Sequence, residues 1–115
     1  MSGWVQMWPV NTRLRFSSRR FLVLWNALLM HFREKPTNEA LDDTRALAEL
    51  CDGVVTLTPG SHVYRQFSLY RRKSPIIVVQ TPTQRVQFAC EARAVEGWLG
   101  AMDNICFATE SDLVA

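Results

Sequence analysis

The sequence predicts a mostly β fold with one C-terminal α-helix, in which seven strands form a bent antiparallel sandwich, or partly open barrel, that the helix caps. Two short apolar runs, residues 76–81 and 85–90, flank the turn residues 82–84 and indicate a hairpin. An amphipathic helix follows at once, and its apolar stripe consists of Val95, Trp98, Leu99, Met102, Ile105 and Cys106. So wide an apolar face needs a surface to cover, and the open end of a small barrel or sandwich provides one. This arrangement is typical of a binding module rather than an enzyme.

Three strand-like segments open the chain. Residues 4–8 form a short apolar run that stops at Pro9, whose nitrogen cannot donate a ladder hydrogen bond. The runs 20–25 and 27–32 are separated only by Asn26 and its neighbours, which indicates a tight hairpin.

The next segment is expected to supply the fourth strand. Residues 33–45 are polar and predict a long loop, with a helical turn around residues 38–41. A strand is expected to start at residues 47–50, to break at Gly53, and to continue or pair again over residues 54–57.

The fifth strand and its flanking turns come next. Pro59-Gly60 predicts a turn, residues 62–71 alternate in places as a half-buried strand does, and residues 71–75 predict another turn. The final helix is expected to begin near residues 91–93 and to end at Cys106 or Phe107.

The length of 115 residues and the ordinary composition, 48% hydrophobic and 21% charged, indicate one globular domain. It is assigned to residues 2–108, and the polar residues 109–115 to a flexible C-terminal tail. The start lacks the features of a secretory signal, and no apolar run reaches the length of a membrane span. The three widely spaced cysteines are expected to be free thiols in a reducing compartment. A cytoplasmic location follows, or one at the periphery of a membrane or of the cytoskeleton.

Charge is distributed in blocks although the net charge is only +2. Residues 1–35, 36–60, 61–90 and 91–115 carry net charges of +5, −4, +5 and −4. Such blocks can make a folded surface bipolar, with a basic face that prefers anionic partners, or they can form a solvated surface with no partner.

The order of these segments, with their residues, resembles the pleckstrin-homology (PH) family over residues 2–107. The similar segments are Gly3-Trp4-Val5, residues 20–24, residues 29–32, residues 47–50, residues 85–91 and residues 98–102, which contain the helix tryptophan Trp98. The resemblance implies a strongly bent seven-stranded sandwich with one end capped by the helix. It assigns structural roles to Trp4, Trp98, Leu99 and Met102.

The resemblance also implies a candidate phosphoinositide site. In the family's usual site a lysine ends the first strand, but this chain has Met7 at that position. A pair of basic residues begins the family's second strand. Here Ser18 replaces the first of the pair and Arg20 retains the second. His31 stands where the family has a tyrosine and could donate a hydrogen bond to a phosphate. Further cations near Arg20 are Arg13, Arg15 and Arg19.

A second placement for an anionic headgroup is similar to the alternative lipid site of spectrin-type members. The loops after the first and fifth strands are expected at the same end of the sheet, which would bring Arg13 and Arg15 toward Arg71, Arg72 and Lys73. Five cations near an anionic surface predict weak, salt-sensitive attraction to a membrane. The other interpretation is a solvated basic rim.

Catalysis and metal binding find no support in the sequence. His31 and His62 are the only histidines, the cysteines form no Cys-x-x-Cys pair, and the glycines form no phosphate-binding loop. We therefore expect no catalytic residue, no metal and no cofactor. Aromatic residues occur beside arginines at Tyr64-Arg65 and Tyr70-Arg71, but the low net charge and the acidic blocks argue against a nucleic-acid partner.

Protein recognition is the remaining class. The implied fold offers an exposed strand edge and a groove beside the helix, where phosphotyrosine-binding domains add a peptide as an extra strand. Trp8 is the candidate partner anchor, since Trp4, Trp8 and Trp25 cannot all lie deep in so small a core, although each could also fill the sandwich. The cysteines and large apolar side chains also allow a homodimer.

We therefore predict a non-catalytic recognition module that positions a larger cytoplasmic protein through a protein partner or a scaffold. The alternative is weak binding of a phosphoinositide or an anionic membrane through the basic loops.

Overall fold

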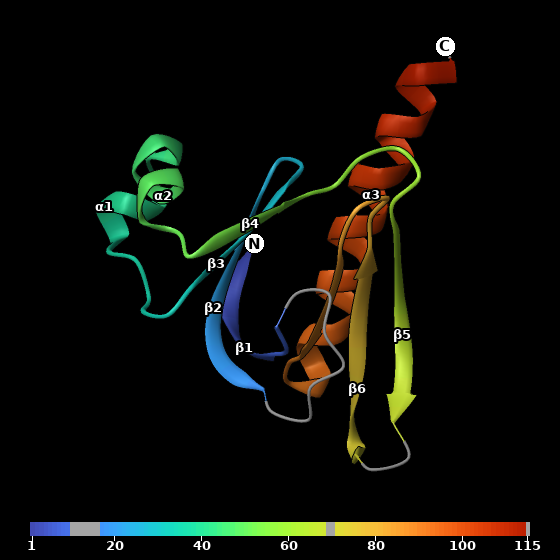
Figure 1. The fold of residues 1–115 in the computed structure, drawn as a ribbon, viewed down its shortest axis with the longest axis horizontal. Coiled ribbons are helices and arrows are strands. Elements are labelled where there is room, and N and C mark those ends of the chain that lie inside the picture. The colour runs from blue at the N-terminus through green and yellow to red at the C-terminus, as the bar shows by residue number, and fades with distance from the viewer. Residues whose placement is uncertain (10–16, 69–70, 115) are drawn as a thin grey trace.

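The computed structural model describes residues 1–9, 17–68 and 71–114, and among these it describes residues 67, 68, 71–74 and 107–114 by their backbone alone. Figure 1 shows the elements in order. They are β1 (Ser2–Met7), β2 (Ser18–Trp25), β3 (Leu28–Phe32), α1 (Asn38–Leu41), α2 (Thr44–Leu50), β4 (Gly53–Thr56), β5 (His62–Ser68), β6 (Arg71–Gln80), β7 (Arg85–Ala89), the 3-10 turn η1 (Ala92–Ala94) and α3 (Val95–Val114).

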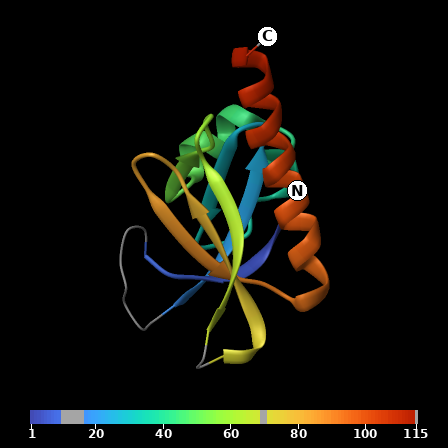
Figure 2. The same ribbon diagram turned by 90° about the vertical axis from the view of Figure 1, so that its right-hand side faces the viewer.

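Seven antiparallel strands form one open sheet in the described part of the chain, in the order β4-β3-β2-β1-β7-β6-β5. Strand β1 joins the two halves of the sheet. It pairs with β2 from Ser2 to Met7, but it pairs with β7 only at Gln6 and Met7. Because this junction is so short, the β1–β4 half and the β5–β7 half can bend toward each other (Figures 1 and 2). The predicted fold class is confirmed.

Helix α3 covers the inner face of the sheet, which we define as the face that carries the main core. Trp98 is only 2% exposed, and its ring meets Phe88 of β7 edge-to-face at 5.7 Å between centroids. Met102 is fully buried in the same core, and Leu99 packs partly buried against it. The predicted capping helix with an inward tryptophan is therefore present.

Two short helices cover the outer face of the β1–β4 half, on the opposite side of the strands from α3 (Figure 1). Leu47 of α2 is fully buried against this face. The predicted helical turn near residues 38–41 is α1, and the oxygen of Thr37 caps it by accepting from the Ala40 amide. Phe21 and Val23 of β2 and Met30 and Phe32 of β3 are buried in this outer cluster.

The strand predicted at residues 47–50 is wrong, because these residues belong to helix α2. The carboxylate of Asp43 caps this helix by accepting from the amides of Arg45 and Ala46, at 3.0 and 3.4 Å. Alanine and leucine also favour a helix, and so short an apolar run carries no decisive periodicity. The fourth strand starts only at Gly53.

The turn predicted at residues 71–75 is also wrong, because these residues begin β6. The pairing of β5 with β6 is irregular between Gln66 and Ser68, and Pro75 lies in the stretch of β6 next to this irregularity. Proline is tolerated at such positions, since a bulge releases its nitrogen from the ladder.

Two of the other predicted turns have a residue with a positive φ. Asn26 adopts a positive φ of 50° in the β2–β3 hairpin, and Gly60 has a φ of 88° before β5. Helix α3 runs to Val114, beyond the predicted end at Cys106 or Phe107. The domain limits 2–108 and the flexible tail 109–115 stay predictions.

Among the described helices, none has both the length and the apolar character that a membrane crossing requires.

Candidate functional site

Arg20 and His31 lie on the inner face of the sheet, near the start of β2. Leu22, which belongs to the inner core, pairs directly with His31 across β2 and β3. Directly paired residues share a face, and Arg20 lies two residues from Leu22 on that same face. The structure therefore brings together two of the residues that the sequence predicted for an anion site.

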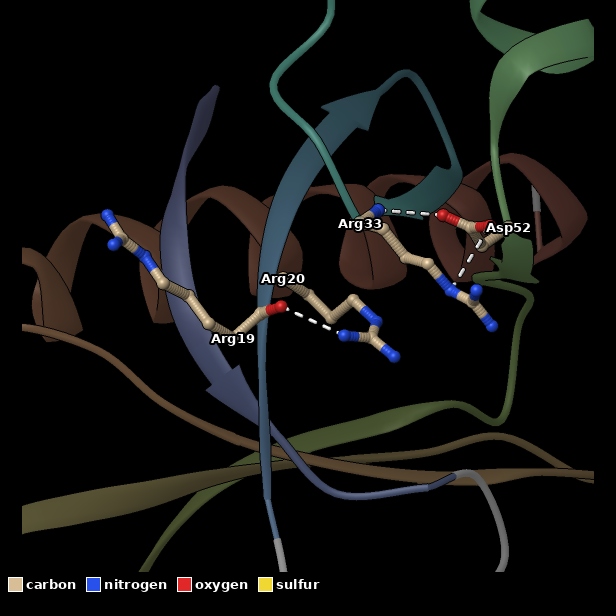
Figure 3. A network of polar contacts seen from close by, with 4 residues as sticks. All are labelled: Arg19, Arg20, Arg33 and Asp52. Carbon is tan, nitrogen blue, oxygen red and sulfur yellow. Dashed lines mark hydrogen bonds and ion pairs between the residues drawn. The ribbon is translucent and has the colours of Figure 1, made fainter.

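Arg33 and Asp52 add a polar network at this end of the sheet (Figure 3). The Arg33 amide donates to Asp52 Oδ2 at 2.7 Å, and the Arg33 Nε atom lies 3.8 Å from Oδ1. The amide of Asp52 donates to the His31 carbonyl at 2.9 Å, which fixes the acid at the end of β3. Sequence reasoning missed both residues, because Asp52 was expected inside a broken strand.

His31 is half-buried, and this position limits its ability to bind an anion through a positively charged imidazole. Burial lowers the pKa of its imidazole, the charge of Arg20 acts in the same direction, and Asp52 opposes both. Its Nδ1 atom is buried and finds no hydrogen-bond partner within the described part of the chain. The ring is therefore favoured in its neutral form, which can donate one hydrogen bond but adds no fixed positive charge.

Arg19 leaves β2 on the other side of the sheet from Arg20 (Figure 3). Its guanidinium carbon lies 4.2 Å from the centre of the Trp4 ring, a cation–π contact. Arg20 instead folds back and donates from Nη1 to the Arg19 carbonyl at 2.9 Å. The two neighbouring cations therefore face opposite sides of one strand and cannot form a single pocket.

The other predicted basic residues fall outside what the structure describes. Arg13 and Arg15 belong to the undescribed residues 10–16, and the side chains of Arg71, Arg72 and Lys73 are likewise outside the description, although their backbone belongs to β6. Their convergence stays a prediction.

Trp8 is not an exposed anchor. It is buried with a relative exposure of 9% and packs with Ile76, Val78 and Ala89. Trp4, assigned a structural role, is 38% exposed, and its ring meets Phe21 edge-to-face at 5.3 Å. Its burial gives no support to a role as an exposed anchor, and contact of Trp8 with a partner stays a prediction.

A groove lies between β5 and α3, which run alongside each other in both views of the fold (Figures 1 and 2). Its volume is about 810 Å³. The residues that line it are Ser61, His62, Val63, Tyr64, Gln80, Asp103, Asn104 and Cys106. In the described sheet β5 is an edge strand, paired only with β6.

The two sides of β5 contribute differently to this groove. Val63 packs against the inner core and faces the helix side, so that His62 and Tyr64 face the outer side by strand alternation. Two residues beyond Val63, the Arg65 guanidinium forms an ion pair with the Glu96 carboxylate of α3. This ion pair bridges strand and helix and bounds the groove toward the start of α3.

Comparisons with known proteins identify the fold. No protein-family model matches the chain, and no curated protein matches its sequence. The solution structure of the PH domain of human oxysterol-binding protein-related protein 11 superimposes with a TM-score of 0.66 at 15% identity, covering 97% of this chain and 83% of that one. The PH domain from TgAPH gives a TM-score of 0.56 at 16% identity, with coverage of 93% and 83%.

These likenesses and the sheet order show that the chain has the PH-domain fold.

Proposed function

We propose that this protein is a non-catalytic recognition module that binds an extended segment of a partner protein and so positions a larger cytoplasmic protein. The segment lies in the groove between β5 and α3 and adds a strand to the edge of the sheet. A PH-domain fold is compatible with binding of either proteins or lipids, and the groove favours the first.

The single observation that carries this proposal is the groove along the edge of β5. An edge strand presents main-chain donors and acceptors that its own sheet does not use, and an extended peptide can pair with them. The walls of the groove would then contact alternate side chains of the peptide. One set faces Val63 and α3, and the other set faces His62 and Tyr64.

A peptide-display experiment tests the proposal. Random nonapeptides selected on the protein should shift the amide resonances of residues 61–65 in a ¹⁵N spectrum. Asn104→Trp places a large ring in the groove from the exposed face of α3 and should weaken binding about tenfold or more.

Ala48→Trp is the matched control, because Ala48 is also exposed but lies on α2 and does not line the groove. It should leave the affinity unchanged. The groove would be excluded as the peptide site if no binding peptide could be selected. It would also be excluded if both variants bound the selected peptides with wild-type affinity.

An anionic membrane surface is the second candidate partner. Among the side chains that the structure describes, those of Arg19, Arg20 and Lys35 form no ion pair with a carboxylate, so they keep their charge available. Together with the predicted basic loops they support weak, salt-sensitive attraction to a phosphoinositide or another acidic lipid. This binding would place the protein at the periphery of a membrane.

Sedimentation with anionic liposomes at moderate salt separates the two candidates. Arg71→Glu combined with Arg72→Glu should abolish membrane binding and spare the peptide. Loss of both activities in a folded double variant would contradict the assignment of the peptide to the groove. Light scattering on the same samples checks the homodimer that the sequence allows.

A further inference from the structure

We infer that the segment bound in the groove is basic, with a lysine or arginine side chain that reaches Asp103 of α3. This inference rests on the proposed function, and it names the chemistry of the partner. Three features support it, namely the charge of helix α3, an ion pair at one end of the groove, and the apolar residues beside Asp103.

The charged residues in the sequence of helix α3 are all acidic. Helix α3 contains four acidic residues and no lysine or arginine in its sequence from Val95 to Val114. Glu96 and Asp103 are seven residues apart, which is close to two helical turns, so they lie on the same stripe of the helix. This stripe faces β5, because Glu96 pairs with Arg65 and Asp103 lines the groove.

The Arg65–Glu96 ion pair shows how this stripe binds a cation. An arginine on the inner side of a strand reaches across to a carboxylate of α3. Two turns further on, Asp103 is exposed and has no ion-pair partner among the side chains that the structure describes. A strand added beside β5 could supply the equivalent cation to Asp103.

The spacing of the two elements agrees with this placement. Seven residues of α-helix span about 10.5 Å. Three residues of β-strand span about 10 Å, so that Asp103 lies level with His62 when Glu96 is level with Arg65.

The floor of the groove at this level is apolar, with Val63 and Cys106 beside Asp103. A lysine or arginine side chain fits such a site better than a short one. Its aliphatic stem covers the apolar floor while the charged end reaches the carboxylate at the rim.

Three synthetic probes test the inference, namely acetylated nonapeptides of alternating serine and valine whose central residue is lysine, norleucine or glutamate. Norleucine keeps the stem of lysine and removes the charge. For the wild-type protein we expect the lysine peptide to bind about three- to fivefold more tightly than the norleucine peptide, as an exposed ion pair allows, and the glutamate peptide to bind most weakly. Calorimetry measures the affinities, and amide shifts of residues 61–65 locate the site.

Asp103→Lys should reverse this order, so that the glutamate peptide binds best. Asp42→Lys makes the same charge change at the end of α1 and should leave the order as in the wild type. Equal affinities for the three peptides, or an order that Asp103→Lys does not change, overturn the inference but leave the groove as a peptide site. Absence of any shift in residues 61–65 with all three peptides overturns the proposed function as well.

Discussion

The imidazole ring of His31 lies directly against Gly53 on the neighbouring strand. The two residues pair across β3 and β4, and a Cβ added to Gly53 would lie 2.3 Å from Nε2 and 2.9 Å from Cε1 of the ring. Glycine is therefore required here by the space that the ring occupies. The contact explains why the fourth strand opens with a glycine, a residue that usually weakens a strand.

Gly53→Ala should lower the free energy of unfolding by about 1–3 kcal/mol, the usual cost of overpacking a well-filled site. The new methyl group would displace the ring of His31, whose Nδ1 edge is buried. Urea denaturation followed by tryptophan fluorescence measures the change, and adding His31→Ala to the same chain should recover part of it.

Gly100→Ala is the matched control for this substitution. Apart from its chain neighbours and the backbone of its own helix α3, no described atom lies within 4 Å of the Cβ that it adds. Alanine is the better helix former, so this variant should be up to about 1 kcal/mol more stable than the wild type. A Gly53→Ala protein as stable as the wild type would mean that the His31 ring moves aside at no cost.

The stability of the protein should depend on pH through His31. Burial lowers the pKa of this imidazole below its ordinary value of 6.5, with Arg20 acting in the same direction and Asp52 against it. As the pH falls through 6.5, the unfolded chain takes up a proton at residue 31 before the folded protein does. The contribution of His31 to the free energy of unfolding is therefore complete above pH 6.5. It is lost progressively as the pH falls from 6.5 to the lower pKa of the folded protein.

Denaturation curves between pH 8 and pH 5 measure this loss, and His31→Gln supplies the reference because glutamine does not titrate. The difference in free energy of unfolding between the wild type and His31→Gln should shrink as the pH falls below 6.5. A difference that stays constant over the whole range would show that burial does not perturb this histidine.

The sequence predicted those parts of the fold that depend on long patterns. The strands around Pro82 and the helix with Trp98 were found because alternation and a wide apolar stripe persist over many residues. Helix α2 was missed because its seven residues carry a single buried side chain, Leu47, and the deciding signal is the cap formed by Asp43. The start of β6 was missed because Pro75 indicates a turn unless a nearby irregularity in pairing is known.

The candidate sites were harder to predict, because they depend on which residues meet across the sheet. Arg19 and Arg20 are adjacent in sequence, yet strand alternation sends them to opposite faces. The ion pair of Arg65 with Glu96 joins residues 31 positions apart. Only the general position of a groove beside the helix followed from the predicted fold, and the residues that line it did not.

The contact between Arg19 and Trp4 should contribute measurably to stability. Arg19→Met keeps most of the stem and removes the charge that lies over the ring. Because a cation–π contact at an exposed site contributes about 0.5–1 kcal/mol, we expect a loss in that range. A double-mutant cycle with Trp4→Leu measures it, and a coupling energy of zero would show that the two side chains only happen to be neighbours.

Arg45→Met is the control for this loss of charge, because Arg45 is exposed on α2 and forms no ion pair among the described side chains. Its free energy of unfolding should stay within about 0.5 kcal/mol of the wild type.

The packing of α3 on the sheet should depend on the buried Trp98 more than on a tryptophan whose ring is exposed. Trp98→Ala removes a ring that is 2% exposed and in edge-to-face contact with Phe88, and should cost about 3–5 kcal/mol. The same substitution at Trp25, which is 39% exposed in β2, removes far less buried area and should cost about 1 kcal/mol. Thermal and urea denaturation compare the two variants directly. Equal losses for both would contradict the position of α3 across the inner face, since only a helix packed there makes the two tryptophans differ.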